Sequence, residues 1–272
     1  MIAVVVPTRD RPAQLVACLA ALGTELYPDD ELVVVDSCSE VPVVCSARTL
    51  RADRPGASRA RNLGWQATNA AVIAFVDDDV LVAPGWRAAI DPAIADADFV
   101  CGRVALPPEQ ADAERPVAVT PDVPRQQLRP GLGLRGVSAN LLIRRTALEG
   151  CGGFDERLGP GTWSRAGEDL ELQDRLLAAG RVGYYEPSVL AFHEQWRSRR
   201  ELVRLDFGYG IGAGARAAWL GGAAGRAVLR EALWDNGLRP VGSDLRKGYQ
   251  LGVVTGIVRT AGALVGYARG RR

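Results

Sequence analysis

Short runs of apolar, mostly β-branched residues, separated by longer stretches with helical spacing, constrain the fold of this chain more than any other feature. The clearest runs cover residues 2–6, 32–35 and 72–76. A strand that is apolar at every position must be buried on both faces, as in a parallel sheet covered by helices. Residues 12–22 and 57–69, between these runs, carry apolar side chains at helical spacing. The alternation therefore predicts an α/β fold with a mostly parallel sheet.

The same patterns continue beyond the first three strands. We expect further strands over residues 99–104 and 137–144, a helix that begins near Pro84, and a helix over residues 168–179 that Gly180 stops. A Pro-rich loop is expected over residues 107–130, and from residue 198 the composition is that of helices. We therefore expect one α/β domain over residues 1–197, with a helical extension over residues 198–272 packed on its acceptor or membrane-surface side.

The composition excludes several classes of protein. Lys and Arg number 33 against 32 Asp and Glu, so the chain lacks the overall positive charge that is typical of nucleic-acid binding. The five cysteines are odd in number and show no C-x-x-C spacing, which favours reduced thiols over disulfides or a zinc site. The apolar start is too short for a signal peptide and lacks a basic leader. We therefore expect a cytoplasmic protein with no nucleic-acid partner.

The C-terminal residues 249–268 have nearly the length of a membrane span and carry one charge, Arg259. Many glycines and a central arginine, which costs about 2.5 to 3.5 kcal/mol on insertion scales, argue against a spanning helix. A buried or interfacial helix is expected instead. The basic residues Arg269, Arg271 and Arg272 leave peripheral contact with the inner face of a membrane open.

Polar residues directly follow each of the first three predicted strands. They are Pro7-Thr8-Arg9, Asp36, and the run Asp77-Asp78-Asp79. In an open α/β sheet, ligands bind outside the carboxyl ends of the strands. The sequence therefore predicts a nucleotide pocket at this edge of the sheet.

The three consecutive aspartates repel one another unless a cation compensates their charge. In an extended segment, Asp77 and Asp79 point the same way and Asp78 points to the opposite side. Mg²⁺ or Mn²⁺ is typically held by one or two carboxylates together with substrate phosphates. A solvated acidic turn explains the run equally well, because Asp is common in turns.

The other candidates each have an ordinary structural explanation as well. Asp36 suits a helix N-cap, and Glu168 and Asp169 suit the first turn of a helix, although a carboxylate there can also serve as a general base. His193, the single histidine, ends an apolar stretch that could bring it to the same edge. Trp163 and Trp196 are candidates for stacking on an acceptor, although aromatic residues of this kind are commonly packed.

The order of these segments resembles that of family-2 glycosyltransferases with the GT-A fold. The resemblance covers roughly the first 195 residues. Six segments carry it, in this order: Val5-Val6-Pro7-Thr8-Arg9, Val34-Val35-Asp36-Ser37, Ala57-Ser58-Arg59-Ala60-Arg61-Asn62, Phe75-Val76-Asp77-Asp78-Asp79, Gly152-Gly153-Phe154-Asp155-Glu156, and Gly167-Glu168-Asp169-Leu170-Glu171-Leu172-Gln173-Asp174-Arg175-Leu176.

The resemblance implies a GT-A type, Rossmann-like sheet flanked by helices, and an inverting transfer of one sugar from a UDP- or dTDP-sugar to a hydroxyl acceptor. The acceptor could be a lipid, a glycan or a small natural product. Asp169 corresponds to the catalytic base, with Glu168 beside it. The resemblance also implies a nucleotide site of Pro7, Thr8, Arg9, Asp36, Arg61, Asp77 and Asp78, and Mn²⁺ or Mg²⁺ on Asp79 and His193.

The chain also departs from the family pattern. The Q-x-x-R-W motif of processive synthases is absent, which favours a single-sugar transferase over a polymerase. Two alternatives stay open: a nucleotidyltransferase, and a catalytically silent protein that binds a nucleotide sugar. A nucleotidyltransferase usually has a Gly-rich loop after its first strand, whereas residues 7–12 contain no glycine.

Overall fold

The computed structural model describes residues 1–110, 118–131, 133–247 and 249–271, and these residues form two compact units. The sheet unit contains the described residues within 1–155 and 172–194. The helical unit contains residues 156–171 and 195–271. Helix α5 (Glu168–Ala178) crosses this division, because its first four residues belong to the helical unit. Residues 156–171 thus join the C-terminal helices rather than the sheet.

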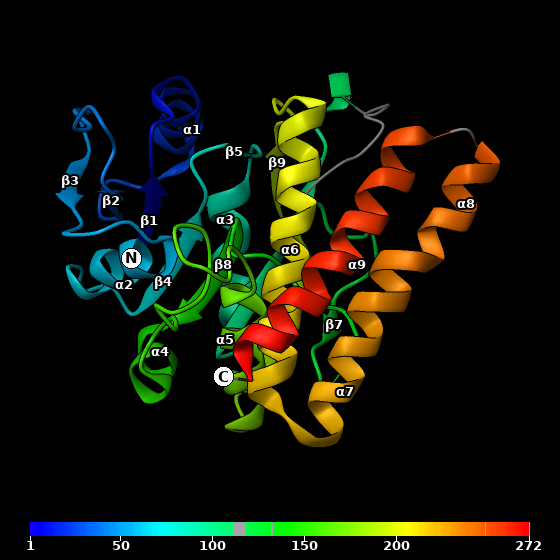
Figure 1. Cartoon of the computed structure of the whole chain (residues 1–272). Helices are drawn as coiled ribbons and strands as arrows, with labels where there is room; N and C mark the ends of the chain where they lie inside the picture. Colours follow the sequence, from blue (N-terminus) through cyan, green and yellow to red (C-terminus); the bar gives the residue numbers. More distant parts are fainter. Residues whose placement is uncertain (111–117, 132, 248, 272) are drawn as a thin grey trace. The chain divides into compact units, whose positions relative to one another are not determined.

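The sheet unit is built on a mixed sheet with the order β3-β2-β1-β4-β8-β6-β9-β5 (Figure 1). Its first four strands are mutually parallel, whereas β8 runs antiparallel to both β4 and β6. The strands described are β1 (Ile2–Thr8), β2 (Glu31–Asp36), β3 (Arg48–Arg51), β4 (Val72–Val76), β5 (Val80–Val82), β6 (Phe99–Ala105), β7 (Gln126–Gln127), β8 (Asn140–Arg144) and β9 (Gly183–His193), with β7 paired to β9.

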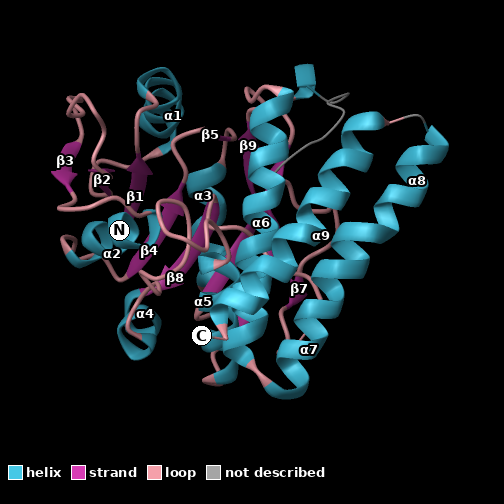
Figure 2. Ribbon diagram, in the orientation of Figure 1, coloured by secondary structure: helices cyan, strands magenta, loops and turns pink. Residues whose placement is uncertain are grey.

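Two apolar cores cover the two faces of this sheet, because alternate residues of each strand point to opposite faces. Ile2, Val4 and Val6 of β1 pack in one core with α1 (Pro12–Glu25) and α3 (Trp86–Ile94). Ala3 and Val5 pack in the other core, which also includes α2 (Ala57–Gln66), α4 (Arg145–Cys151) and the later residues of α5. Figure 2 shows these helices around the strands. The predicted α/β architecture is confirmed.

The predicted strands over residues 2–6, 32–35, 72–76 and 99–104 all appear, some with one or two further residues. The strand expected over 137–144 begins later, at Asn140, because a turn bonds the Asn140 N–H to the Val137 carbonyl. The Pro-rich loop expected over 107–130 contains the short helix η1 (Pro108–Gln110) and β7. Residues 111–117 of that loop lie outside the described residues.

The helical unit confirms the predicted C-terminal helices. Its C-terminal part comprises α6 (Arg199–Leu220), α7 (Gly222–Arg230), the π-helix η2 (Glu231–Leu238), α8 (Arg239–Lys247) and α9 (Gln250–Gly270). Within this unit α9 contacts α6 on one side and η2 and α8 on the other (Figure 1). Helix α6 starts with a capping box, in which Ser198 and Glu201 satisfy each other's backbone N–H groups.

Gly64 allows helix α2 to lie close against the sheet. A Cβ at this position would overlap the side chain of Val5 and lie 3.1 Å from Cγ2 of Val35. Both valines are fully buried in the sheet. The helix that carries Arg61 is therefore set on the sheet by the absence of a side chain at position 64.

Replacing Gly64 with alanine should lower the free energy of unfolding by about 1 to 3 kcal/mol, because the added methyl overpacks the core. Gly23→Ala on α1 is the matched control, since a Cβ at position 23 meets no atom within 4 Å. The control should raise stability by up to about 1 kcal/mol, as alanine is the better helix former. Urea unfolding measures both variants, and a Gly64→Ala protein as stable as the parent would contradict the close approach of α2.

Candidate active site

The carboxyl ends of β1, β2 and β4 meet at one edge of the sheet unit. Thr8 is paired in register with Asp36, and the N–H of Ser37 donates to the carbonyl of Thr8 at 2.8 Å. The hydroxyl of Thr8 donates to Oδ2 of Asp78 at 2.7 Å. Pro7, also buried at the end of β1, pairs with Val35. The polar residues predicted from three separate segments thus come together.

Each of the three aspartates after β4 lies close to at least one basic side chain. Asp77 forms an ion pair with Arg61 of α2 at 2.7 Å, and the Arg61 side chain is almost completely buried. Asp79 lies 3.4 Å from Nε2 of His193, the last residue of β9. Arg11 donates to Asp78 at 2.8 Å and lies 3.3 Å from Asp79. Residues predicted for the nucleotide and for the metal are therefore neighbours in the sheet unit.

Burial changes the pKa values of groups at this site. It raises the pKa of Asp78 to about 6; Arg11 opposes that rise, and the neighbouring Asp79 adds to it. Beneath the aspartates, the Cys18 thiol lies 3.6 Å from the Asp77 carbonyl oxygen, and burial and then the three carboxylates raise its pKa. The cluster sets three carboxylates against two arginines, which favours a positively charged ligand.

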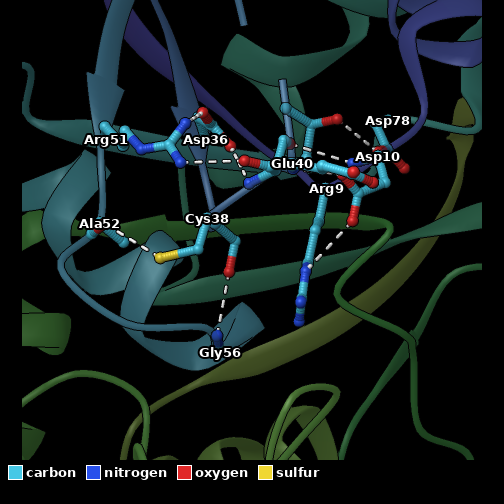
Figure 3. Close-up of polar contacts among 12 residues, drawn as sticks. Arg9, Asp10, Asp36, Cys38, Glu40, Arg51, Ala52, Gly56 and Asp78 are labelled. Carbon is cyan, nitrogen blue, oxygen red and sulfur yellow. Dashed lines mark hydrogen bonds and ion pairs between the residues drawn. The ribbon is translucent and has the colours of Figure 1, made fainter. Parts of the chain in front are cut away.

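Hydrogen bonds hold Asp36 at the end of β2, among them the bond from Arg51 (Figure 3). It accepts from the N–H groups of Ser39 at 2.7 Å and Val43 at 3.3 Å, and from Arg51 of β3 at 2.5 Å. Burial favours the neutral acid, but the bonds from Ser39 and Val43 and the charge of Arg51 hold the pKa of Asp36 below its ordinary value. The side chain is therefore an ionised acceptor in a fixed orientation.

The loops after β1 and β2 are tied to each other (Figure 3). The N–H of Asp10 donates to the Ser39 hydroxyl, and the N–H of Glu40 donates to the Asp10 carboxylate. Asp10 and Cys38 have positive φ angles of 55° and 61°, a conformation that costs energy for residues other than glycine. Arg9 is half exposed and lies 3.4 Å from Asp10. The cross-links between the loops stabilise this backbone at the predicted nucleotide site.

Asp79 and His193 present an oxygen and a nitrogen ligand at nearly the same point, and both side chains are buried. Over the described residues, no group of three His, Cys, Asp or Glu side chains forms a metal cluster. The pair suits a hard divalent cation that takes its remaining ligands from a diphosphate and water, as Mg²⁺ commonly does. The donor set thus fits the implied cofactor without forming a complete cage.

The remaining predicted site residues belong to the helical unit. Glu168 is buried, and its carboxylate lies against Gly159. Asp169 is partly exposed in the first turn of α5, where its Oδ1 accepts from the N–H of Leu170. Trp163 packs edge-on against Trp219, and the guanidinium of Arg269 lies over the Trp163 ring. The guanidinium of Arg197 lies over the ring of Trp196 in the same way.

Tyr209 of α6 is a neighbour of Asp169 that the sequence did not indicate. Burial raises the pKa of Tyr209; Arg197 and Arg259 lower it, while Asp169 and Asp206 raise it. These residues form a charged group around a phenol within the helical unit. The Gly208–Gly212 run that contains Tyr209 has no phosphate-loop geometry, since it lies inside α6.

Two further arginines of the sheet unit were missed. Arg11 bridges Asp78 and Asp79, and Arg51 holds Asp36. Arg11 comes two residues after Arg9, in the loop that was predicted to bind the nucleotide, so its position was a weak indication of a role at the site. Arg51 offered none, because its short strand contains two arginines and lies at the sheet edge.

Replacing Thr8 with valine keeps the shape and removes the hydroxyl that donates to buried Asp78. We expect the free energy of unfolding to fall by about 1 to 3 kcal/mol, the cost of an unsatisfied buried polar group. In the control Thr24→Val, an exposed hydroxyl that donates to the Ala21 carbonyl is lost, and the change should stay within about 0.5 kcal/mol. Thermal unfolding compares the two, and equal stabilities would mean that the Thr8 hydroxyl does not support Asp78.

Several known proteins resemble this chain. A protein of Mycobacterium tuberculosis named pre-mycofactocin glycosyltransferase is 28% identical across the whole of this chain, which spans 57% of the length of that relative. The solved structure of a mannosyltransferase from Pyrobaculum calidifontis, in complex with GDP-Man and Mn²⁺, superposes with a TM-score of 0.64 at 16% identity, covering 97% of this chain and 86% of the other. These likenesses confirm the GT-A fold.

A second solved structure, that of S. aureus TarS 1-349 with UDP-GlcNAc, gives a TM-score of 0.57 at 13% identity and covers 97% of this chain and 92% of that chain. The family described as Glycosyl transferase family 2 matches residues 3–152, which include the ends of β1, β2 and β4 and helix α2. That match covers more than half of the sequence. On this match, the chain belongs to glycosyl transferase family 2.

Proposed function

We propose that this chain is an inverting glycosyltransferase that moves one sugar from a nucleotide diphosphate to a hydroxyl acceptor. The observation that carries the proposal is the convergence of Thr8, Asp36, Arg61 and Asp77 to Asp79 at one edge of the sheet. Loop N–H groups, a fixed carboxylate and the guanidinium of buried Arg61 suit the base, ribose and phosphates of a nucleotide. The family match over residues 3–152 supports the same reading.

The geometry of Asp36 favours uracil or thymine as the base. Both oxygens of this ionised carboxylate are already engaged, Oδ1 by the N–H of Ser39 and Oδ2 by Val43 and Arg51. A carboxylate engaged in this way suits one further bond, from the single ring N–H of uracil or thymine, better than a pair of bonds that needs both oxygens free. Guanine presents two adjacent donors on the same edge, and cytosine has no ring N–H there. We therefore favour a UDP- or dTDP-sugar as the donor.

In the proposed reaction, the acceptor oxygen attacks the anomeric carbon as the bond from that carbon to the diphosphate oxygen breaks. Asp169 takes the proton of the acceptor hydroxyl, and Glu168 lies beside it at the start of α5. Arg61 and Arg11 would stabilise the departing diphosphate. A single displacement inverts the anomeric configuration.

Asp79 and His193 would hold the divalent ion, Mn²⁺ or Mg²⁺, with Asp77 and Asp78 beside it. When bound, the ion supplies positive charge that stabilises the leaving diphosphate. The distance of 3.4 Å between Asp79 and His193, with the carboxylates of Asp77 and Asp78 beside them in the chain, supports this assignment. The Mn²⁺ in the mannosyltransferase structure is consistent with it.

For the acceptor, we propose a hydroxyl on a lipid, a glycan or a small natural product, and the residues from 198 onward as the region that selects it. The likeness to a protein named for pre-mycofactocin supports a natural product among these. We propose the cytoplasm as the place where the chain works, a compartment in which cysteines stay reduced. The described cysteines form no disulfide with one another.

Calorimetric titration with UDP, dTDP, GDP and CDP, each with and without Mn²⁺, tests the nucleotide site. We expect UDP or dTDP to bind with micromolar affinity in the presence of Mn²⁺, and to bind at least about tenfold more weakly with chelator, because the diphosphate then lacks its counter-charge. Preferential binding of GDP would overturn the argument from Asp36. Binding that is unchanged in chelator would remove the metal.

Asp169→Asn separates the transferase from a silent nucleotide-sugar-binding protein. The rate of sugar transfer should fall by about 100- to 10,000-fold, the usual contribution of a general base, while donor binding is retained. Asp235→Asn is the control, since that carboxylate also belongs to the helical unit and faces exposed Arg239. Transfer at the parental rate by the Asp169 variant would show that another group takes the proton.

A further inference from the structure

The balanced overall charge of the chain conceals a strong asymmetry. Residues 195–272 contain 14 Lys and Arg against five Asp and Glu, whereas residues 1–194 contain 19 against 27. Over the described residues of 222–271, every charged side chain in the exposed class is basic: Arg226, Arg230, Arg239, Arg246, Lys247, Arg269 and Arg271. The C-terminal helices therefore present a positive surface on a chain whose remainder is acidic.

Helix α9 adds an apolar face to this positive surface. Val254, Ile257, Leu264 and Val265 are 47% to 54% exposed, and Ala261 and Ala268 between and beyond them are exposed as well. The spacing of three, four and seven residues places these side chains along one side of the helix. The stripe spans most of the length of α9. A soluble helix ordinarily turns such a stripe inward.

The opposite side of α9 is made of small residues that touch helix α6 backbone to backbone. A Cβ on Gly262 would overlap the Phe207 carbonyl, and one on Gly266 would overlap the Ile211 carbonyl. Gly210 and Gly214 of α6 meet α9 in the same way. Small residues between helices and large apolar residues outside are the arrangement of helices packed in lipid, where burial of apolar surface does not drive association.

A second set of apolar side chains lies on the neighbouring η2 and α8. Trp234 is 56% exposed and Leu245 is 64% exposed, with Leu238 between them at 44%. Both elements contact α9. Tryptophan, like tyrosine, is enriched at the boundary between lipid and water.

We propose that the helical unit binds the surface of an anionic lipid bilayer through α9, with η2 and α8 beside it. The exposed stripe of Val254, Ile257, Leu264 and Val265 would enter the boundary between headgroups and acyl chains. The exposed arginines and Lys247 would contact the anionic headgroups. Apolar side chains and a basic surround together are the features of an interfacial helix, and neither requires that the chain be a glycosyltransferase.

Helix α9 lies on the bilayer rather than across it. It is long and apolar enough to span, by length and composition, and is the one such helix among the described residues. Its centre, however, carries Arg259, whose guanidinium pairs at 2.5 Å with fully buried Asp206 of α6. Moving this pair into the hydrocarbon would cost far more than leaving it at the interface.

Sedimentation of the full chain with vesicles tests the proposal. One set is phosphatidylcholine alone, and the other contains phosphatidylcholine and phosphatidylglycerol in equal parts. We expect binding to the anionic vesicles that weakens as salt is raised, and little binding to the neutral ones. Replacing Arg246 and Lys247 with Gln should weaken binding by about fivefold for each charge removed.

Val265→Glu should reduce vesicle binding by at least about tenfold, because a carboxylate then faces the acyl chains and the headgroups. Val16→Glu on α1 is the matched control, since it makes the same change at an exposed valine of the sheet unit and should bind as the parent does. Circular dichroism verifies that both variants fold.

Three results would overturn the proposal. The first is a parent protein that binds neither set of vesicles, and the second is a Val265→Glu variant that binds as tightly as the parent. The third is a dimer, seen by light scattering, that Val265→Glu separates; the stripe would then be covered by a second copy of the chain.

Discussion

Three consecutive aspartates at the end of a buried strand impose the constraint on which the candidate site depends. Two of them are almost completely buried, and burial without compensation would force them to take up protons. Four groups contact the aspartates: Arg61 from a helix, Arg11 from a loop, the hydroxyl of Thr8 and the imidazole of His193. These groups come from three separate segments, namely β1 with the loop after it, α2 and β9, so the charge of the cluster ties these elements to the end of β4.

The first half of the sheet could be predicted from sequence because its strands are buried on both faces and therefore carry an unbroken apolar pattern. Strand β3 could not be predicted, because it lies at the sheet edge and its sequence, Arg-Thr-Leu-Arg, lacks an apolar run. The order of β8, β6 and β9 in the sheet could not be predicted either, because the composition of a strand does not indicate which strands it pairs with or in which direction. Among site residues, those at strand ends were predictable, whereas Arg51 became relevant only when pairing of β2 with β3 set it beside Asp36.

The helical unit was the least readable part of the sequence for a physical reason. Its glycines lower helix propensity, yet they occupy the contacts between α6 and α9, where backbone meets backbone. A pattern of large apolar residues at helical spacing is normally read as the buried face of a helix. In α9 that pattern marks the exposed face, and the small residues mark the buried one, so the usual rule points the wrong way.

The helical unit is discontinuous in sequence, since residues 156–171 belong with helices that begin only at Arg199. Gly167 touches the backbone of Gly212, and Trp163 packs on Trp219 and Arg269, all within that unit. The segment that precedes Asp169 thus acquires its shape from the end of the chain. Exchanging the C-terminal helices for those of a relative would therefore also require a matching loop from the middle of the chain.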